Sequence, residues 1–488
     1  ALVMQWSSVA LLFAGVAIGV VAGAIPGMSA TMAVALTLPF TFSLGPIEGI
    51  LLLLGVYKGG IFGGAIPAIL IKTPGTPASS ATVLDGYPMA EKGEAGRALS
   101  IALYASCTAD LISNLALILF AGWLATLALS FRPPEFFTLI LFSLTIIAGV
   151  SGPTLLKGLI SAALWLLLAT VGLDLVYGTD RFVFGEPNLM GGLNFIAVLI
   201  GLFAIPEIIA FARDPVEREG RVRGLGRKGA SWADYRKSFK SIIRGGLLGS
   251  VLGAIPGIGA APSAFLSYSE ARRTSTTPET FGTGEVEGVA ASEAGNNGVA
   301  GATLIPLLAL GVPGDVITAI IIGAFMIHGL QPGPLMFATN GPVVYALFIG
   351  LILSSVFLLI WGSIAIRAFR LIAEVPKTLL FPGVLVLCVF GVYAVNNSVF
   401  DVGVMFAMGW VGYAMMRLDV PAAPFLIAFI LGPLLEDNFR QAMLMSGSSP
   451  AILFSSPITW VFWGATAVTV GALVRGQLRR RRDARASA

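Results

Sequence analysis

Two polar segments of this largely apolar chain carry residue types that can bind small ions. Residues 72–80 read KTPGTPASS, which combines hydroxyl groups, backbone amides and one positive charge. Residues 292–297 read SEAGNN, and their neutral amides can donate to a carboxylate or coordinate a cation. Helix N-termini beside broken backbone attract carboxylates, whereas freed carbonyls coordinate Na⁺. The two segments therefore predict a site shared by an anion and a cation.

Each candidate in the first segment also has a purely structural interpretation, and the sequence leaves both open. Thr73, Thr76 and Ser79 could contact a ligand or could cap a helix that follows Pro74. Lys72 could bind an anion, extend to the membrane surface or pair with an acidic residue.

The candidates in the second half have similar alternatives. Asn296 and Asn297 could bind a ligand or satisfy broken backbone, and Asp315 occupies a good N-cap position after Pro-Gly. The single histidine, His328, is interpreted as structural. Four further carboxylates flank or interrupt apolar runs and could be interface residues or coupling groups: Asp110, Asp174, Glu207 and Asp401.

Catalytic motifs are absent from the sequence. It has no HExxH, no GxSxG, no P-loop and no cysteine pair with metal-ligand spacing. A single histidine gives a Ser-His or metal-histidine mechanism little to work with. We therefore expect a protein that is not an enzyme, that needs no cofactor and that does not hydrolyse ATP.

Composition places these segments in a membrane. Of the 488 residues, 56% are hydrophobic and 11% are charged, against about 25% charged in an ordinary soluble protein. About 20 apolar residues span a bilayer, and several uncharged runs are that long: 1–47, 111–131, 136–156, 316–366, 378–400 and 441–474. We predict an all-α polytopic membrane protein with about 11–13 transmembrane or re-entrant segments.

An internal repeat divides the chain. Residues 15–27, GVAIGVVAGAIPG, match 245–257, GGLLGSVLGAIPG, at eight of thirteen positions and an offset of 230. Both copies carry glycine at every fourth position, which allows close helix packing, and both end in Ala-Ile-Pro-Gly, which breaks a helix. A second match, at an offset of 239, aligns Ile66-Pro67 and Pro74-Gly75-Thr76 with Ile305-Pro306 and Pro313-Gly314-Asp315.

The basic residues predict the topology. Ten of the 30 Lys and Arg residues lie in 213–244 and six lie in 475–488, whereas none precedes Lys58. Basic loops stay cytoplasmic, so the N-terminus is expected outside and the C-terminus inside. The two repeat copies then run in opposite directions, as in many secondary transporters. A reporter fused after Arg223 would test this topology, because a periplasmic signal there contradicts it.

The predicted organisation has four parts. Residues 1–212 form the first repeat half and 213–244 a basic cytoplasmic linker. Residues 245–474 form the second half, which needs one extra crossing, and 475–488 form a basic cytoplasmic tail. Residues 245–270 could form either one interrupted span or a re-entrant hairpin.

Several motifs resemble one family in order along almost the whole chain. They read GAIPGMSATMAVALTLPF, IKTPGTPASSATVLDGYPMAEKGEAGRAL, GAIPGIGAAPSAF and EGVAASEAGNNGVAGATLIPLLALGVPGD, followed by IHGLQPGP. Together they resemble the large membrane subunit of tripartite tricarboxylate transporters. Lys72 departs from that family's pattern, in which a neutral polar residue precedes Thr-Pro-Gly, and its charge would alter the substrate preference.

The resemblance implies a multi-pass transporter of the bacterial inner membrane, driven by a cation gradient, Na⁺ before H⁺, with an elevator-type mechanism. Its expected partners are a small four-helix membrane subunit and a periplasmic solute-binding protein that delivers a citrate-like di- or tricarboxylate. By motif, the resemblance places Ser29, Thr73, Gly75, Thr76 and Asn297 on the substrate side. The residues themselves add Lys72, Ser79 and Gly314 as substrate-binding candidates. The Na⁺ ligands would be the carbonyls near Gly27 and Gly257, with Asn296.

Three other functions remain possible from the sequence. A channel can also use glycine-rich broken helices, but it rarely needs an inverted repeat. An intramembrane enzyme would need a catalytic pair, which the sequence does not show. A structural subunit without transport activity would give the Pro-Gly breaks no purpose.

Overall fold

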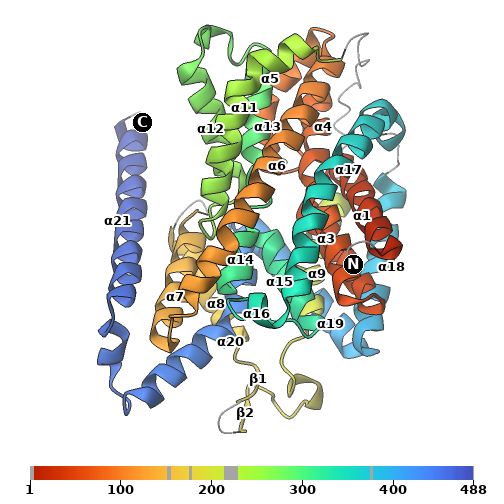
Figure 1. The fold of residues 1–488 in the computed structure, drawn as a ribbon. Helices are drawn as coiled ribbons and strands as arrows, with labels where there is room; N and C mark the ends of the chain where they lie inside the picture. The colour runs from red at the N-terminus through yellow and green to blue at the C-terminus, as the bar shows by residue number, and fades with distance from the viewer. Residues whose placement is uncertain (1–4, 151–154, 175–177, 214–228, 374–376, 487–488) are drawn as a thin grey trace. The chain divides into compact units, whose positions relative to one another are not determined.

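The computed structural model describes residues 5–150, 155–174, 178–213, 229–373 and 377–486. These residues are almost entirely helical, as predicted, with a single two-stranded hairpin as sheet. By length and composition, nine helices within them can cross a membrane. The chain is therefore a polytopic helical membrane protein (Figure 1).

The chain divides into two compact units, each drawn from both ends of the sequence. Unit 1 comprises Ala1–Ala125 and Glu207–Asn397. Its helices are α1 (Trp6–Ala24), α2 (Ala30–Thr37), η2 (Leu38–Ser43), α3 (Pro46–Gly63), α4 (Ala65–Ile71), α5 (Ser79–Glu91), most of α6 (Ala95–Ala128), α10 (Ile205–Arg213), α11 (Trp232–Gly253), α12 (Ala260–Thr274), η4 (Pro278–Thr280), α13 (Val286–Asn297), α14 (Leu304–Leu310), α15 (Val316–Ile327), α16 (Met336–Thr339), α17 (Gly341–Ala373) and α18 (Lys377–Asn396).

Unit 2 comprises Thr126–Pro206 and Ser398–Ala488. Its elements are α7 (Pro133–Val150), α8 (Leu155–Leu168), β1 (Gly172–Leu173), β2 (Asp180–Arg181), η3 (Pro187–Leu189), α9 (Phe195–Phe203), α19 (Val399–Arg417), α20 (Ala422–Met445), η5 (Pro450–Phe454) and α21 (Pro457–Ala486). The antiparallel pair β1–β2 is held to α20 by two ion pairs, Arg181–Glu436 and Asp174–Arg440, each at 2.7 Å.

The glycine stripes pack against backbone in the same way in both repeat halves. A Cβ added to Gly19 of α1 would overlap the carbonyl oxygen of Val56 in α3. In the second half, a Cβ on Gly249 of α11 would lie 3.0 Å from the carbonyl oxygen of Gly295 in α13. Val56 and Gly295 are themselves 239 residues apart, so the offset that aligns the Pro-Gly motifs also aligns the packing partners. Only glycine permits this close approach of two helices.

The Pro-Gly motifs end helices, as predicted. α1 ends two residues before Pro26, and α11 ends three residues before Pro256. The glycines that follow these prolines have matching left-handed backbones, with φ of 90° at Gly27 and 87° at Gly257. After the second break the chain returns, and α12 packs beside α11 against α13 (Figure 1). Residues 232–274 thus form a helical hairpin within unit 1, although the opposite membrane orientation of the two halves stays a prediction.

The basic linker is partly helical. Residues 214–228 of the expected linker, 213–244, lie outside the described residues. α11 begins at Trp232, where Ser231 accepts from the Asp234 amide in a capping box, and it therefore includes residues 232–244. α21 likewise continues into the expected tail as far as Ala486. The helix before the second break is thus longer than the sequence repeat suggested.

Candidate functional site

Each repeat half folds its second Pro-Gly motif onto its own helix break. The amide of Gly75 donates to the Gly64 carbonyl at 3.1 Å, and a Cβ on Gly75 would lie 2.7 Å from the Gly23 carbonyl oxygen. In the second half the Gly257 amide donates to the Gly314 carbonyl at 2.7 Å. Three of the predicted site glycines, Gly75, Gly257 and Gly314, therefore lie at these two junctions.

The hydroxyl residues of the first segment form the start of α5. The Ser79 amide donates to Thr76 Oγ1 at 3.2 Å, and the two hydroxyl oxygens are 2.8 Å apart. Thr73 donates from its hydroxyl to the Ile71 carbonyl at 3.3 Å. Thr76 thus accepts the first amide of α5, although the N-cap residue of that helix is Ala78, and ligand contact by Thr76 stays a prediction. Capping does not occupy all of the lone pairs of the Thr76 hydroxyl. The amides of Ser79 and Ser80 are themselves bonded, to the carbonyls of Thr76 at 3.1 Å and of Pro77 at 3.3 Å.

Lys72 has a backbone conformation that its residue type disfavours. It ends α4 with φ of 59°, in the left-handed region. The residue at its repeat position, 239 residues later, is Gly311 with φ of 71°. A side chain costs about 1–2 kcal/mol in this region. The exposed ammonium lies 5.5 Å from the centre of the Tyr87 ring, beside the loop that leads to Thr76.

The helices α5 and α13 pack with a register that the side-chain contacts define. Near the start of α13, a Cβ on Gly288 would collide with the carboxylate of Asp85. Farther along, Glu293 accepts a hydrogen bond from Thr82, three residues earlier on α5. Along these contacts, residue numbers rise on α13 and fall on α5, so the two helices are antiparallel. The next turn of α13 therefore faces the first turn of α5. Asn296 is therefore on the face of α13 that looks toward Ser79 and Thr76.

Asn296 has an unsatisfied amide at this point. Its side chain is 1% exposed, and Nδ2 has no hydrogen-bond partner among the residues that the structure describes. The residue at the matching repeat position, Tyr57 of α3, is fully bonded. Its hydroxyl donates to Asp315 Oδ2 at 3.0 Å and lies 3.3 Å from Thr303 Oγ1. Tyr57 thus bonds to the residue that follows Gly314. At the matching position of the other half, Asn296 Nδ2 is a buried donor without a described partner.

Asn297, the second predicted asparagine, is bonded inside the protein. Its Nδ2 donates to Ser106 Oγ at 2.8 Å and to Glu293 Oε2 at 3.2 Å. Ser106 itself donates to Glu293 Oε2 at 3.1 Å, and Thr82 donates to Oε1. Glu293 is completely buried, and the described residues offer it hydroxyl and amide donors without a cation. The substrate role of Asn297 stays a prediction.

A buried ion pair lies on α3 next to Tyr57. Lys58 pairs with Asp110 of α6, and its ammonium also donates to Asn114 Oδ1 at 2.8 Å. Ser355 of α17 donates to Asp110 Oδ2 at 2.6 Å. All the formal charge here is paired and hydrogen-bonded, so burial is tolerated. Asp110, left open between interface and coupling roles, is a partner of Lys58.

The candidates near the first break are only partly buried. Ser29 caps α2 by accepting from the Met32 amide at 3.1 Å, and it also hydrogen-bonds Glu207 of α10. Gly27 is exposed, and a Cβ there would meet the ring of Phe381 at 3.9 Å. No described group of three or more His, Cys, Asp or Glu residues could hold a metal. The Na⁺ roles of Gly27, Gly257 and Asn296 stay predictions.

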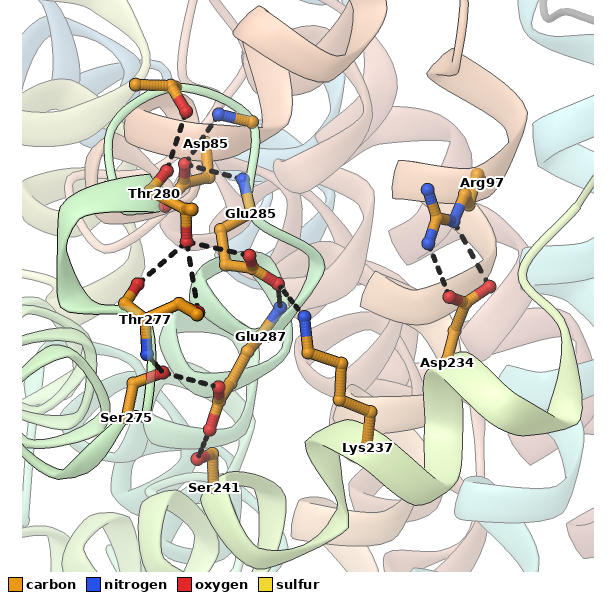
Figure 2. A network of polar contacts seen from close by, with 12 residues as sticks. Asp85, Arg97, Asp234, Lys237, Ser241, Ser275, Thr277, Thr280, Glu285 and Glu287 are labelled. Carbon is orange, nitrogen blue, oxygen red and sulfur yellow. Dashed lines mark hydrogen bonds and ion pairs between the residues drawn. The ribbon is translucent and has the colours of Figure 1, made fainter.

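A network of mostly buried or partly buried polar groups fixes the loop that precedes α13 (Figure 2). Asp85 Oδ1 accepts from the amides of Gly282, Gly284 and Glu285, each at 2.8 Å. Beside it, Arg97 donates to both oxygens of Asp234 at 3.1 and 2.5 Å. The guanidinium lowers the pKa of Asp234 to about 2. The bonds from Asp85 thus fix the start of α13 against α5.

Sequence reasoning missed three of the residues that organise this region: Tyr57, Lys58 and Glu293. The signal was available, because an offset of 239 pairs Tyr57 with Asn296 and Lys58 with Asn297. Asp315 forms a capping box with Thr318, as expected, while its bond to Tyr57 was not foreseen. His328 is partly exposed at the end of α15.

The sequence matches one family model and two curated proteins. The family model described as "Tripartite tricarboxylate transporter TctA family" matches residues 9–427. An uncharacterized 52.8 kDa protein in the TAR-I ttuC′ 3′ region of Agrobacterium vitis is 36% identical over 471 residues, covering 96% of this chain and 94% of that protein. An uncharacterized protein in the TAR-II ttuC′ 3′ region of the same organism is 34% identical over 235 residues, covering 48% of this chain and 97% of that protein. No solved structure matches. The chain belongs to the tripartite tricarboxylate transporter TctA family.

Proposed function

We propose that this chain is the large transmembrane subunit of a binding-protein-dependent secondary transporter. It imports a citrate-like di- or tricarboxylate across the bacterial inner membrane by an elevator-type movement, coupled to a Na⁺ gradient. A small four-helix membrane subunit and a periplasmic solute-binding protein complete the system, as expected for a tripartite family. The N-terminus faces the periplasm and the basic C-terminus faces the cytoplasm.

The observation that carries the proposal is the buried amide of Asn296 opposite the start of α5. A buried donor without a partner costs about 1–3 kcal/mol, and a carboxylate would satisfy it. The Thr76 hydroxyl would donate to the same carboxylate. Lys72, exposed beside this loop, would attract the remaining negative charge.

The test is citrate binding to the purified chain and its Asn296→Ala and Thr76→Val variants, measured by isothermal titration calorimetry. Each variant loses about 1–3 kcal/mol of interaction and should bind about 5- to 150-fold more weakly. Asn188→Ala, at an exposed asparagine of unit 2, is the matched control and should bind normally. Unchanged citrate binding by correctly folded Asn296→Ala would contradict the proposed site. Tartrate and succinate in the same assay would separate tri- from dicarboxylate preference.

A further inference from the structure

Glu293 is a fully buried carboxylate that no described cation neutralises. It lies on α13, and its 0% exposure excludes screening by water. The only buried ion pair among the described side chains, Lys58–Asp110, belongs to a separate network on α3 and α6. An isolated ionised carboxylate is strongly disfavoured in such an interior. Glu293 is therefore neutralised either by a proton or by a cation that the described residues do not supply.

The groups around Glu293 are the oxygen ligands that a hard cation prefers. Thr82 of α5 and Ser106 of α6 direct hydroxyl groups at its two carboxylate oxygens. Ser292 adds a third hydroxyl 3.3 Å from that of Thr82. Hydroxyl groups that now donate can rotate and present lone pairs instead. Carboxylate, hydroxyl and amide oxygens suit hard ions and do not suit soft transition metals.

The position of this cluster links it to the proposed substrate site. Thr82 lies three residues after Ser79 on α5, and Glu293 lies three residues before Asn296 on α13. Residues three apart on a helix are neighbours on one face. One helical turn on each of the same two helices thus separates the cluster from the unpartnered Asn296 amide. An ion bound by the Glu293 carboxylate, in place of the direct Thr82–Glu293 hydrogen bond, would set the spacing of α5 and α13 that the substrate needs.

We propose that Glu293, Thr82 and Ser106 form the binding site of the coupling cation, and that this cation is Na⁺. The inference rests on the proposed function for its coupling role. It replaces the expectation that Asn296 is a Na⁺ ligand, because Asn296 then serves the substrate. The bound ion would stabilise the α5–α13 contact and so raise the affinity for a carboxylate, and the reverse effect follows from linkage.

The test is direct ²²Na⁺ binding to the purified full-length chain without any carboxylate, so that a wrong substrate leaves the result unaffected. Wild-type protein should bind Na⁺ saturably. Glu293→Gln removes the charge and should lower Na⁺ affinity at least about 100-fold. Glu287→Gln, the same change in the first turn of the same helix, is the matched control and should bind like wild type.

Three results would overturn the assignment. These are normal Na⁺ binding by Glu293→Gln, no Na⁺ binding by the wild type, or equal loss of binding in Glu287→Gln. If Glu293→Gln does not fold, two variants of Thr82 test the site instead. Thr82→Ser keeps the hydroxyl and should retain Na⁺ binding, whereas Thr82→Val should weaken it about 10-fold. Equal affinities for those two variants would also overturn the site.

Discussion

Packing does not explain why a lysine stands at position 72, because its side chain is exposed and its backbone is left-handed. Its left-handed backbone is strained, and the matching position of the other half carries glycine. A non-glycine residue in such a conformation at a functional loop indicates a side chain that is needed there. We propose that the charge of Lys72 attracts the substrate.

Replacing Lys72 with glycine should separate stability from binding. Lys72→Gly relieves the left-handed strain and should raise the free energy of unfolding by about 1 kcal/mol, seen as a higher midpoint of thermal unfolding in detergent. The same variant should bind citrate more weakly, because a positive charge is lost. Lys72→Arg is the control and should retain affinity without the gain in stability. Tighter citrate binding by Lys72→Gly would contradict this role.

The Arg97–Asp234 pair predicts a defined loss of stability in acid. The pKa of Asp234 is lowered to about 2 in the folded chain, against about 3.9 in an unfolded one. Its contribution is therefore complete above pH 4 and is lost as the pH falls from about 4 toward 2. Thermal unfolding across this range should show a smaller decline for Arg97→Gln, which is already less stable at pH 7. Parallel pH profiles of the two proteins would contradict the assignment.

At the scale of helices, close glycine contacts fix the repeat architecture. Gly19→Ala and Gly249→Ala would push α1 from α3 and α11 from α13, because the added Cβ meets backbone that cannot move alone. Each should lower the free energy of unfolding by about 1–3 kcal/mol. Gly464→Ala on α21 meets no described atom within 4 Å and should raise it by up to about 1 kcal/mol. Thermal unfolding of the three variants tests the packing. A stabilised Gly19→Ala would contradict it.

The sequence predicts helix ends better than it predicts partners. Proline and glycine affect the backbone of their own and adjacent residues. The helix breaks at Pro26, Pro74, Pro256 and Pro313 could therefore be predicted from the sequence alone. The pairing of Glu293 with Thr82 joins positions 211 residues apart and depends on the register of two helices. A single sequence carries no direct record of that register. The start of α11 at Trp232 was missed because charge suggested a loop.

At the scale of the molecule, both halves of the sequence contribute to each compact unit. Unit 1 contains all four Pro-Gly motifs, the free Asn296 amide and the Glu293 cluster. Unit 2 contains none of the proposed ligands. In the proposed elevator mechanism, unit 1 would therefore be the part that carries substrate and ion.

The central claim is ion-coupled carboxylate import, and uptake into proteoliposomes tests it most directly. The vesicles would contain this chain, its small membrane subunit and its periplasmic binding protein, with labelled citrate outside. The account predicts uptake that requires both the binding protein and an inward Na⁺ gradient. Asn296→Ala should raise the citrate concentration needed for half-maximal uptake. Uptake driven by a pH gradient with no response to Na⁺ would replace Na⁺ with H⁺ as the coupling ion. Flux that ignores every ion gradient would contradict the account.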